Sequence, residues 1–412
     1  MIVKNTHYLQ AFFFIFIGFF PVFIKEIFDV SSLWLGVAII ALIIIMTNLK
    51  VLPKVKVLPK VKLSNYLLLN VSLLIFFTNF FLNFSFEKKP ILSLFLILII
   101  FYSAKIWSKT IFLNSLSLRS AVSKVFFFLI FLGLLAYLTN SSMSHFFYGR
   151  SQGVFPFGER SNFALFFGPF FILYVVQLRD LFKRLLVILF VGIMALLLPS
   201  ATLLTYVALA LLLLIKFRPG RIVLLLFMSF YAVYIILNEP YFMSRFTLSS
   251  ESTNLTALVY LQGLFDAYNA LINTHGLGLG FQMMGTQPPS ENFNQIKMVL
   301  GQGADGVGIN REDGGFVAVK IVAEFGVLGL IILFFYLKLF LKVFLKLRRL
   351  VSASNDTDHA FVFSLVFIYT AVIEIFVRGV GYFSPSLFLF FTALFLFGHY
   401  QKKRGDSSRC YY

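Results

Sequence analysis

The stretch 185–215 reads LLVILFVGIMALLLPSATLLTYVALALLLLI, and the number of times it crosses a membrane decides the topology of the whole chain. It contains no charged residue. As a single helix, its 31 residues would extend about 46 Å at 1.5 Å per residue. That length exceeds the hydrocarbon core of a bilayer, which is about 30 Å thick. The sequence PSAT at 199–202 is typical of a tight turn. We therefore predict a hairpin of two short helices.

The composition around this stretch indicates a membrane protein. Of the 412 residues, 59% are hydrophobic and 13% are charged, whereas an ordinary soluble domain has about 25% charged residues. Apolar runs that could cross a bilayer as helices recur along the chain. We expect an all-α polytopic bundle of about 12 spans, at 8–24, 33–49, 63–86, 91–107, 125–140, 162–178, 185–198, 201–215, 222–237, 316–337, 359–377 and 385–400.

The positive charges favour the hairpin over a single helix. With twelve spans and a cytoplasmic N-terminus, the cytoplasmic segments hold 25 of the 35 Lys and Arg residues. A single helix at 185–215 would invert every later segment and break this positive-inside pattern. The net charge of +18 is thus spread over segments that face anionic lipid. We therefore expect no nucleic-acid partner, and we place both termini in the cytoplasm.

This topology divides the chain into three regions. Residues 1–237 contain the first nine spans, with a first large outer loop at 140–161. Residues 238–315 form a long outer loop, and 316–412 contain the last three spans and a cytoplasmic tail. Within the long loop, apolar residues at 258, 261, 265, 268 and 272 have helical spacing. They predict an amphipathic helix, capped by Thr253 or Asn254 and ended by Gly276, that lies on the outer leaflet or over the bundle.

The segment after this loop carries charges inside an apolar run. Residues 310–329 read NREDGGFVAVKIVAEFGVLG. On a helix, Asp313, Lys320 and Glu324 would share one face, and Lys320 and Glu324 are spaced to form an ion pair. Ionisable groups in a membrane normally face a partner or a cavity. Gly326 and Gly329 would allow close helix packing.

A second pair of charged residues has the same spacing. Glu374 and Arg378 stand four residues apart in the eleventh expected span, near its outer end. The two pairs together indicate a polar cavity that opens toward the outer face, below the long loop.

The basic residues on the outer side include five arginines, and arginine suits bidentate recognition of phosphate. Each arginine could instead pair with a nearby carboxylate, Arg160 with Glu159 and Arg311 with Asp313. The two outer histidines, His145 and His275, have no second ligand at metal spacing, so we expect no metal site and no cofactor. The five outer arginines are Arg150, Arg160, Arg245, Arg311 and Arg378.

Four segments within 140–340 resemble the O-antigen polymerase (Wzy-type) family, which is related to the O-antigen ligases. They are Arg150 with the following SQGVFPFGERSNFALFF, the hairpin sequence PSATLL, the NTHGLGLGF end of the long-loop helix, and DGGFVAVKIVAEFGVLGL at 313–330. Ligases typically carry a His-Asn type pair eleven residues before the first glycine of the Gly-x-x-Gly turn. Here that place holds Gly315 and Phe316, so polymerase is favoured over ligase.

The resemblance implies a bacterial inner-membrane glycosyltransferase that works at the periplasmic face without a metal. Its substrate would be an oligosaccharide linked to undecaprenyl diphosphate, and a protein that regulates chain length is a further implied partner. Such a site needs cations for the diphosphate and a base for the acceptor hydroxyl. We expect the arginines above in the first role, and Asp313 in the second with His275 as the alternative. A ligase, and a transporter or flippase of lipid-linked oligosaccharide, remain alternatives, although no half-to-half repeat is found.

Overall fold

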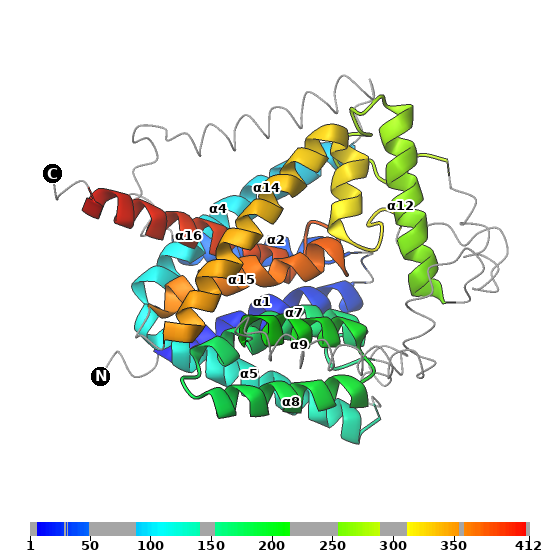
Figure 1. Cartoon of the computed structure of the whole chain (residues 1–412). Helices are drawn as coiled ribbons and strands as arrows, with labels where there is room; N and C mark the ends of the chain where they lie inside the picture. Colours follow the sequence, from blue (N-terminus) through cyan, green and yellow to red (C-terminus); the bar gives the residue numbers. More distant parts are fainter. Residues whose placement is uncertain are drawn as a thin grey trace, which may run out of the picture.

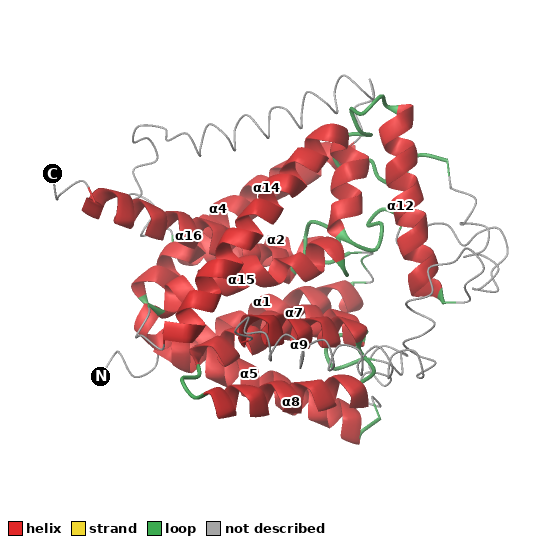
Figure 2. Ribbon diagram, viewed as in Figure 1, coloured by secondary structure: helices red, strands yellow, loops and turns green. Residues whose placement is uncertain are grey.

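A computed structural model of the chain describes residues 6–28, 30, 32–48, 88–140, 153–214, 254–288, 311–353 and 358–408. In this part of the chain the regular structure is entirely helical (Figures 1 and 2). The expected all-α class is thus confirmed. Five of the helices in the described ranges are long and apolar enough to cross a membrane, namely α1 (Thr6–Ile27), α4 (Lys88–Leu113), α5 (Ser115–Leu138), α14 (Val317–Ala353) and α15 (His359–Phe376).

The other described helices are shorter or more polar. They are α2 (Trp34–Thr47), α7 (Arg160–Gln177), α8 (Leu181–Leu197), α9 (Ala201–Leu214), α12 (Leu255–Asn273) and α16 (Pro385–Ser408). The expected spans at 63–86 and 222–237 lie outside the described residues, so the total of twelve remains a prediction.

The stretch 185–215 forms the predicted hairpin. Helix α8 ends at Leu197, and α9 begins at Ala201 and packs back against α8. Ser200 caps the second helix because its hydroxyl accepts a hydrogen bond from the Leu203 backbone N–H at 3.3 Å. The turn at PSAT therefore divides an apolar run that is too long for one span.

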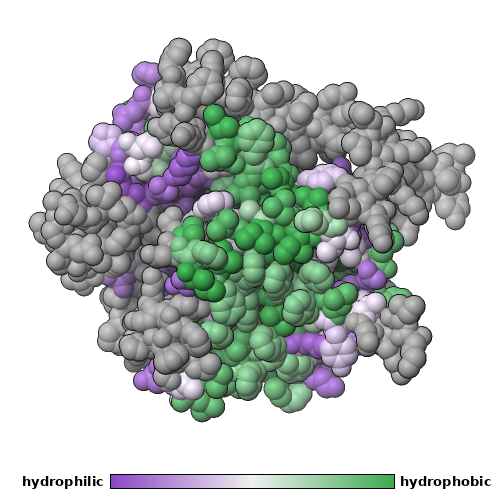
Figure 3. All heavy atoms as spheres, turned by 180° about the vertical axis from the view of Figure 1, so that it is seen from behind, coloured by the Kyte–Doolittle hydropathy of each residue, from purple (hydrophilic) through white to green (hydrophobic). Residues whose placement is uncertain are grey.

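Phenylalanine-rich packing holds the bundle together. Helix α15 lies at its centre, against α5, α7, α9, α14 and α16, and nearly all of its side chains are buried. On α7, the rings of Phe163 and Phe167 stack at 5.4 Å between centroids, and Phe170 meets Phe367 of α15 at 5.4 Å. Large leucine and phenylalanine side chains also remain exposed on α8. The rear view shows a broad hydrophobic surface, as expected for helices that face lipid (Figure 3).

Helix ends that the topology predicts to share one side do lie together. Near the start of α1, the Gln10 amide donates to the Asn114 carbonyl between α4 and α5 at 3.3 Å. The buried Arg184, at the start of α8, donates to the Val351 carbonyl near the end of α14 at 3.0 Å. All of these residues belong to segments expected on the cytoplasmic side. These two contacts join helix ends that the predicted topology places on the same side of the membrane. Which side that is remains a prediction.

Helix α14 is broken at Gly326, where φ is 57° and ψ is −132°. The loop after α12 supplies hydrogen bonds at this break. The N–H groups of Leu279 and Gly280 donate to the carbonyls of Ala323 and Glu324, both at 2.9 Å, and the Val327 N–H donates to the Gly276 carbonyl at 2.8 Å. The expected span at 316–337 is therefore not one straight helix. Figure 1 shows its short first part meeting the long second part at a sharp angle.

The first part of α14 (317–325), helix α12 and the loop 274–288 form what we call the end layer. Helix α12 stands across one end of the bundle, roughly perpendicular to most of its helices (Figure 1). The predicted boundaries of α12 are confirmed. At the start of α12, the Asn254 side chain accepts hydrogen bonds from the Thr256 and Ala257 N–H groups. After its end, the Gly276 N–H donates to the Leu271 carbonyl at 2.7 Å.

The apolar face predicted for α12 is only partly packed, since Leu258 is buried but the later members of the face are not. Phe265, Tyr268 and Ile272 are exposed, whereas Gln262 and Asp266 are buried. Small residues of both helices, such as Ala267, Ala270 and Ala323, let α12 approach α14 closely and leave the larger side chains outside. The exposed face leaves an apolar surface at this end of the molecule.

Replacing Gly326 tests whether the break in α14 is required. In Gly326→Ala, the new Cβ would collide with the Gly276 carbonyl, and the backbone at 326 has a positive φ that alanine rarely adopts. We therefore expect destabilisation by at least about 2 kcal/mol. Gly398→Ala is the matched control, because nothing lies within 4 Å of a Cβ there. The measurement is thermal unfolding of both purified variants in detergent. Equal stability would show that the break is not needed.

Candidate functional site

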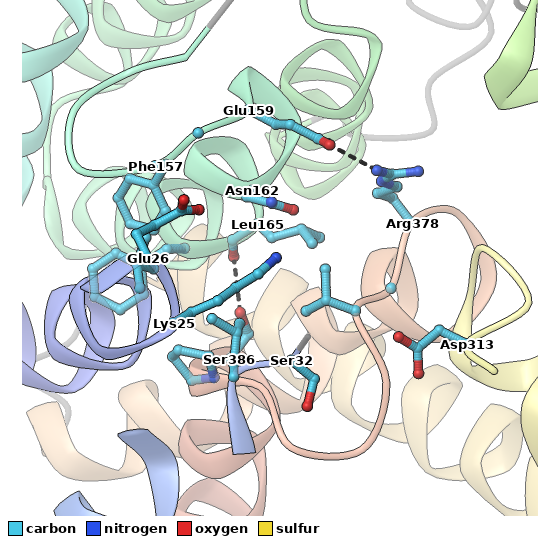
Figure 4. A pocket seen from close by; sticks show the side chains of 17 residues that line it. Lys25, Glu26, Ser32, Phe157, Glu159, Asn162, Leu165, Asp313, Arg378 and Ser386 are labelled. Carbon is cyan, nitrogen blue, oxygen red and sulfur yellow. Dashed lines mark hydrogen bonds and ion pairs between the residues drawn. The ribbon is translucent and has the colours of Figure 1, made fainter. Parts of the chain in front are cut away.

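A pocket of about 120 Å³ opens at the end of the bundle beside the end layer (Figure 4). Four segments that are distant in sequence form its wall. They are the end of α1 with the start of α2, the turn before α7 together with the first turns of α7, Asp313, and the connection from α15 to α16. The polar lining residues are Lys25, Glu26, Ser32, Glu159, Asn162, Asp313, Arg378 and Ser386. Every one of these segment ends belongs to the predicted outer side.

Charges of both signs line the pocket. Arg378 pairs with Glu159 at 2.9 Å, and their side chains are 15% and 45% exposed, so the pair remains accessible at the rim. Lys25 extends into the space between these residues and Ser386 (Figure 4). Asp313, from the segment that leads into α14, lies on the same side of the pocket as Arg378 and across from Lys25 (Figure 4). The pocket thus combines two cations with three carboxylates. Glu159 pairs with Arg378, whereas Asp313 pairs with Lys320.

Three helices begin at the pocket wall. Ser32 and Leu33 precede α2, Glu159 precedes α7, and Pro385 starts α16. The starts of α2 and α7 have no side-chain cap. The first backbone N–H groups of a helix carry partial positive charge and bind anions. Together with Lys25 and Arg378, these helix ends suit a negatively charged group.

Asp313 is held by the buried Lys320. The ammonium group of Lys320 lies 3.2 Å from the Asp313 carboxylate and donates to the Glu312 carbonyl at 2.6 Å. Across the pocket wall, Gly381 has a φ of +82°, and a Cβ there would lie 2.5 Å from Asp313 Oδ1. Lys320 on one side and the bare backbone of Gly381 on the other therefore define the position of this carboxylate.

Lys320 also joins the pocket to the end layer. Its ammonium lies 3.8 Å from Glu324, as the spacing predicted, and 5.1 Å from the centre of the Tyr382 ring. Glu324 in turn accepts from the Met284 N–H in the loop of the end layer at 3.4 Å. Burial, reinforced by the nearby Glu324 carboxylate, raises the pKa of the Tyr382 hydroxyl well above its usual value. Tyr382 therefore keeps its proton next to that carboxylate.

Two sequence-based expectations about charged residues are wrong. Asp313 does not lie on a helix face with Lys320, because α14 begins only at Val317; the two meet through the turn between them. Glu374 and Arg378 do not pair, because α15 ends at Phe376 and Arg378 turns toward Glu159. Glu374 is buried and accepts a hydrogen bond from the Ser384 hydroxyl.

The remaining candidate residues lie away from the pocket or outside the described residues. Arg311 donates to the Gln287 carbonyl within the end layer, and Asp313 pairs with Lys320 instead of Arg311. Arg160 begins α7, and His275 is exposed after α12; neither lines the pocket. Arg150 and Arg245 lie outside the described residues, as does most of the long loop.

Sequence reasoning missed Lys25, Glu26 and Asn162. Lys25 and Glu26 follow the first apolar run directly, which marks them as residues at a membrane boundary. Asn162 is the third residue of α7, directly after Arg160 and Ser161, and nothing in the sequence pattern distinguishes it. Only the packing of α1 and α7 beside the α15–α16 connection brings these residues to Asp313 and Arg378.

Comparisons of the chain with protein-family models, with curated proteins and with solved structures found no match.

Removing Lys320 should destabilise the protein strongly. Lys320→Met leaves the Glu324 carboxylate, whose side chain is 0% exposed, without its cation, at an expected cost of about 3 kcal/mol or more. Lys89→Met is the matched control, since Lys89 and Glu312 are 45% and 64% exposed and such a pair contributes about 1 kcal/mol at most. Thermal unfolding in detergent compares the two variants. Similar losses of stability would contradict the role of Lys320.

Proposed function

We propose that the protein is a polysaccharide polymerase that transfers a growing glycan from undecaprenyl diphosphate to a lipid-linked sugar repeat unit. The observation that carries the proposal is the convergence of Asp313, Arg378 and Lys25 on one pocket with the uncapped N-termini of α2 and α7. A carboxylate that shares one pocket with cations and helix starts suits glycosyl transfer from a diphosphate. The resemblance to the O-antigen polymerase family, within 140–340, points to the same chemistry.

In the proposed reaction, a hydroxyl of the acceptor sugar attacks the anomeric carbon of the donor glycan. The bond from that carbon to the diphosphate oxygen breaks, and the hydroxyl proton passes to the Asp313 carboxylate. Arg378, Lys25 and the starts of α2 and α7 stabilise the negative charge that develops on the departing diphosphate. The good leaving group makes a protein acid unnecessary, so one carboxylate suffices.

The proposal assigns the pocket to the periplasmic side of a bacterial inner membrane, with about twelve spans and cytoplasmic termini. The positive-inside distribution supports this orientation, because the segments around the pocket are those that the topology places outside. The exposed apolar face of α12 supports it too, since a helix across the end of the bundle could rest on the outer leaflet. Lipid-linked substrates would then reach the pocket at the membrane surface.

The broken helix α14 favours a transporter of the same lipid-linked sugars as a second candidate, because transporters often carry discontinuous helices. In those proteins, free carbonyls at the break bind ions or substrate. Here the carbonyls of Ala323 and Glu324 accept hydrogen bonds from the end-layer loop. This observation favours a structural role for the break, and we retain transferase as the first proposal.

Substitutions at the pocket test the transferase. We expect Asp313→Asn to slow glycan elongation about 100-fold or more, because the base is lost. Arg378→Ala and Lys25→Ala should each lower the rate about 100-fold, because a contact to the developing charge is lost. Glu312→Gln is the matched control, since Glu312 neighbours Asp313 but does not line the pocket. The assay uses purified protein in detergent with the lipid-linked repeat unit. Normal elongation by Asp313→Asn would refute the assigned base.

Labelling tests the proposed orientation. Cys410 is the only cysteine, so Cys410→Ser provides a background for single-cysteine variants. Glu312→Cys, at the pocket end, should react with a membrane-impermeant maleimide in cells whose outer membrane is permeabilised and whose inner membrane is intact. Arg349→Cys, which is exposed in the last turns of α14, should react only after the inner membrane is permeabilised. The reverse pattern would place the pocket in the cytoplasm and exclude the proposed reaction site.

A further inference from the structure

Asn162 presents an unfilled hydrogen-bonding atom at the pocket. It occupies the third position of α7, and its side chain lines the cavity beside Glu159 and Leu165 (Figure 4). Its Oδ1 is buried and accepts no hydrogen bond from any residue that the structure describes. A buried acceptor without a donor costs folding free energy. Such an atom in a pocket wall indicates a group that a ligand completes.

Arg378 provides a complementary atom in the same pocket. One terminal nitrogen of its guanidinium pairs with Glu159, but the buried Nε has no acceptor among the described residues. The pocket wall thus lacks one donor, at Asn162, and one acceptor, at Arg378. Phosphate oxygens can only accept from Arg378, so a diphosphate alone leaves the Asn162 oxygen unfilled. A hydroxyl group both donates and accepts, and it satisfies either atom.

We infer that Asn162 forms a specificity-determining subsite that accepts a hydrogen bond from a sugar hydroxyl, next to the position of the diphosphate. This inference rests on the proposed function. It adds the positions of the sugar and of the diphosphate within the pocket. The sugar lies beside the Asn162 side chain, and the phosphates lie toward Lys25, Arg378 and the helix starts. A site that hydrogen-bonds a substrate hydroxyl discriminates against analogues that lack it. Asn162 therefore contributes to the choice of glycan.

Gln177 provides a matched control on the same helix. Both polar atoms of its amide are buried and have no partner among the described residues, yet it lies at the opposite end of α7 and lines no part of the pocket. An unsatisfied amide is therefore not a ligand site by itself. The cavity and the neighbouring Arg378 distinguish Asn162 from Gln177.

The test compares Asn162→Ala and Gln177→Ala with the wild type, using the lipid-linked repeat unit extracted from the cells that make this protein. We measure thermal stability, binding as a ligand-induced thermal shift, and the kinetics of elongation. Both variants should be at least as stable as the wild type, since each removes a buried unsatisfied group. Asn162→Ala alone should raise KM and weaken binding about three- to tenfold, with kcat within about twofold, as for one lost hydrogen bond.

Each other outcome has a defined meaning. Unchanged binding by Asn162→Ala overturns the subsite, and so does a loss of its stability, because either result makes Asn162 structural. Binding without elongation by the wild type refutes the transferase but leaves the subsite supported if Asn162→Ala weakens that binding. A wild type that binds no lipid-linked repeat unit overturns both proposals.

Discussion

The buried ammonium of Lys320 is the contact on which the pocket depends. It reaches the Asp313 carboxylate, the Glu312 carbonyl and the Glu324 carboxylate while only 2% of the residue is exposed. A lone charge at such burial would be costly, so the ammonium and its acceptors stabilise one another only when all are in place. Glu324 extends the network to the end-layer loop, so the position of Asp313 is coupled to the packing of α12 on α14.

The break in α14 makes this network possible. A continuous helix would carry Lys320 and Glu324 in line with the later, lipid-facing residues of α14. At Gly326 the chain instead changes direction, and the loop from Gly276 to Gly280 satisfies the backbone groups that the break releases. Unpaired backbone groups near a membrane are unfavourable, which explains why a glycine-rich loop lies there.

Much of the fold could be predicted from local patterns, but the site could not. Hydropathy located the described helices, and the PSAT turn, the Asn254 cap and the Gly276 end are each set by neighbouring residues. The predicted ion pair between Glu374 and Arg378 was wrong because it assumed that one helix continues through both residues. Helical spacing did not specify which face of α12 packs against the bundle, because small residues of both α12 and α14 set that contact. The glycan-transfer chemistry remains a proposal from the pocket and the resemblance.

The amino-acid sequence by itself determined a set of apolar helices suited to a membrane, with a hairpin at 185–215, because helix length and hydropathy depend on nearby residues alone. Only the tertiary structure brought Lys25, Asn162, Asp313 and Arg378 to one pocket. These residues come from four segments whose own hydropathy and spacing carry no information about their mutual distance. Packing of α1, α7 and α14 around α15 and α16 sets that distance, so the candidate site is a property of the assembled bundle.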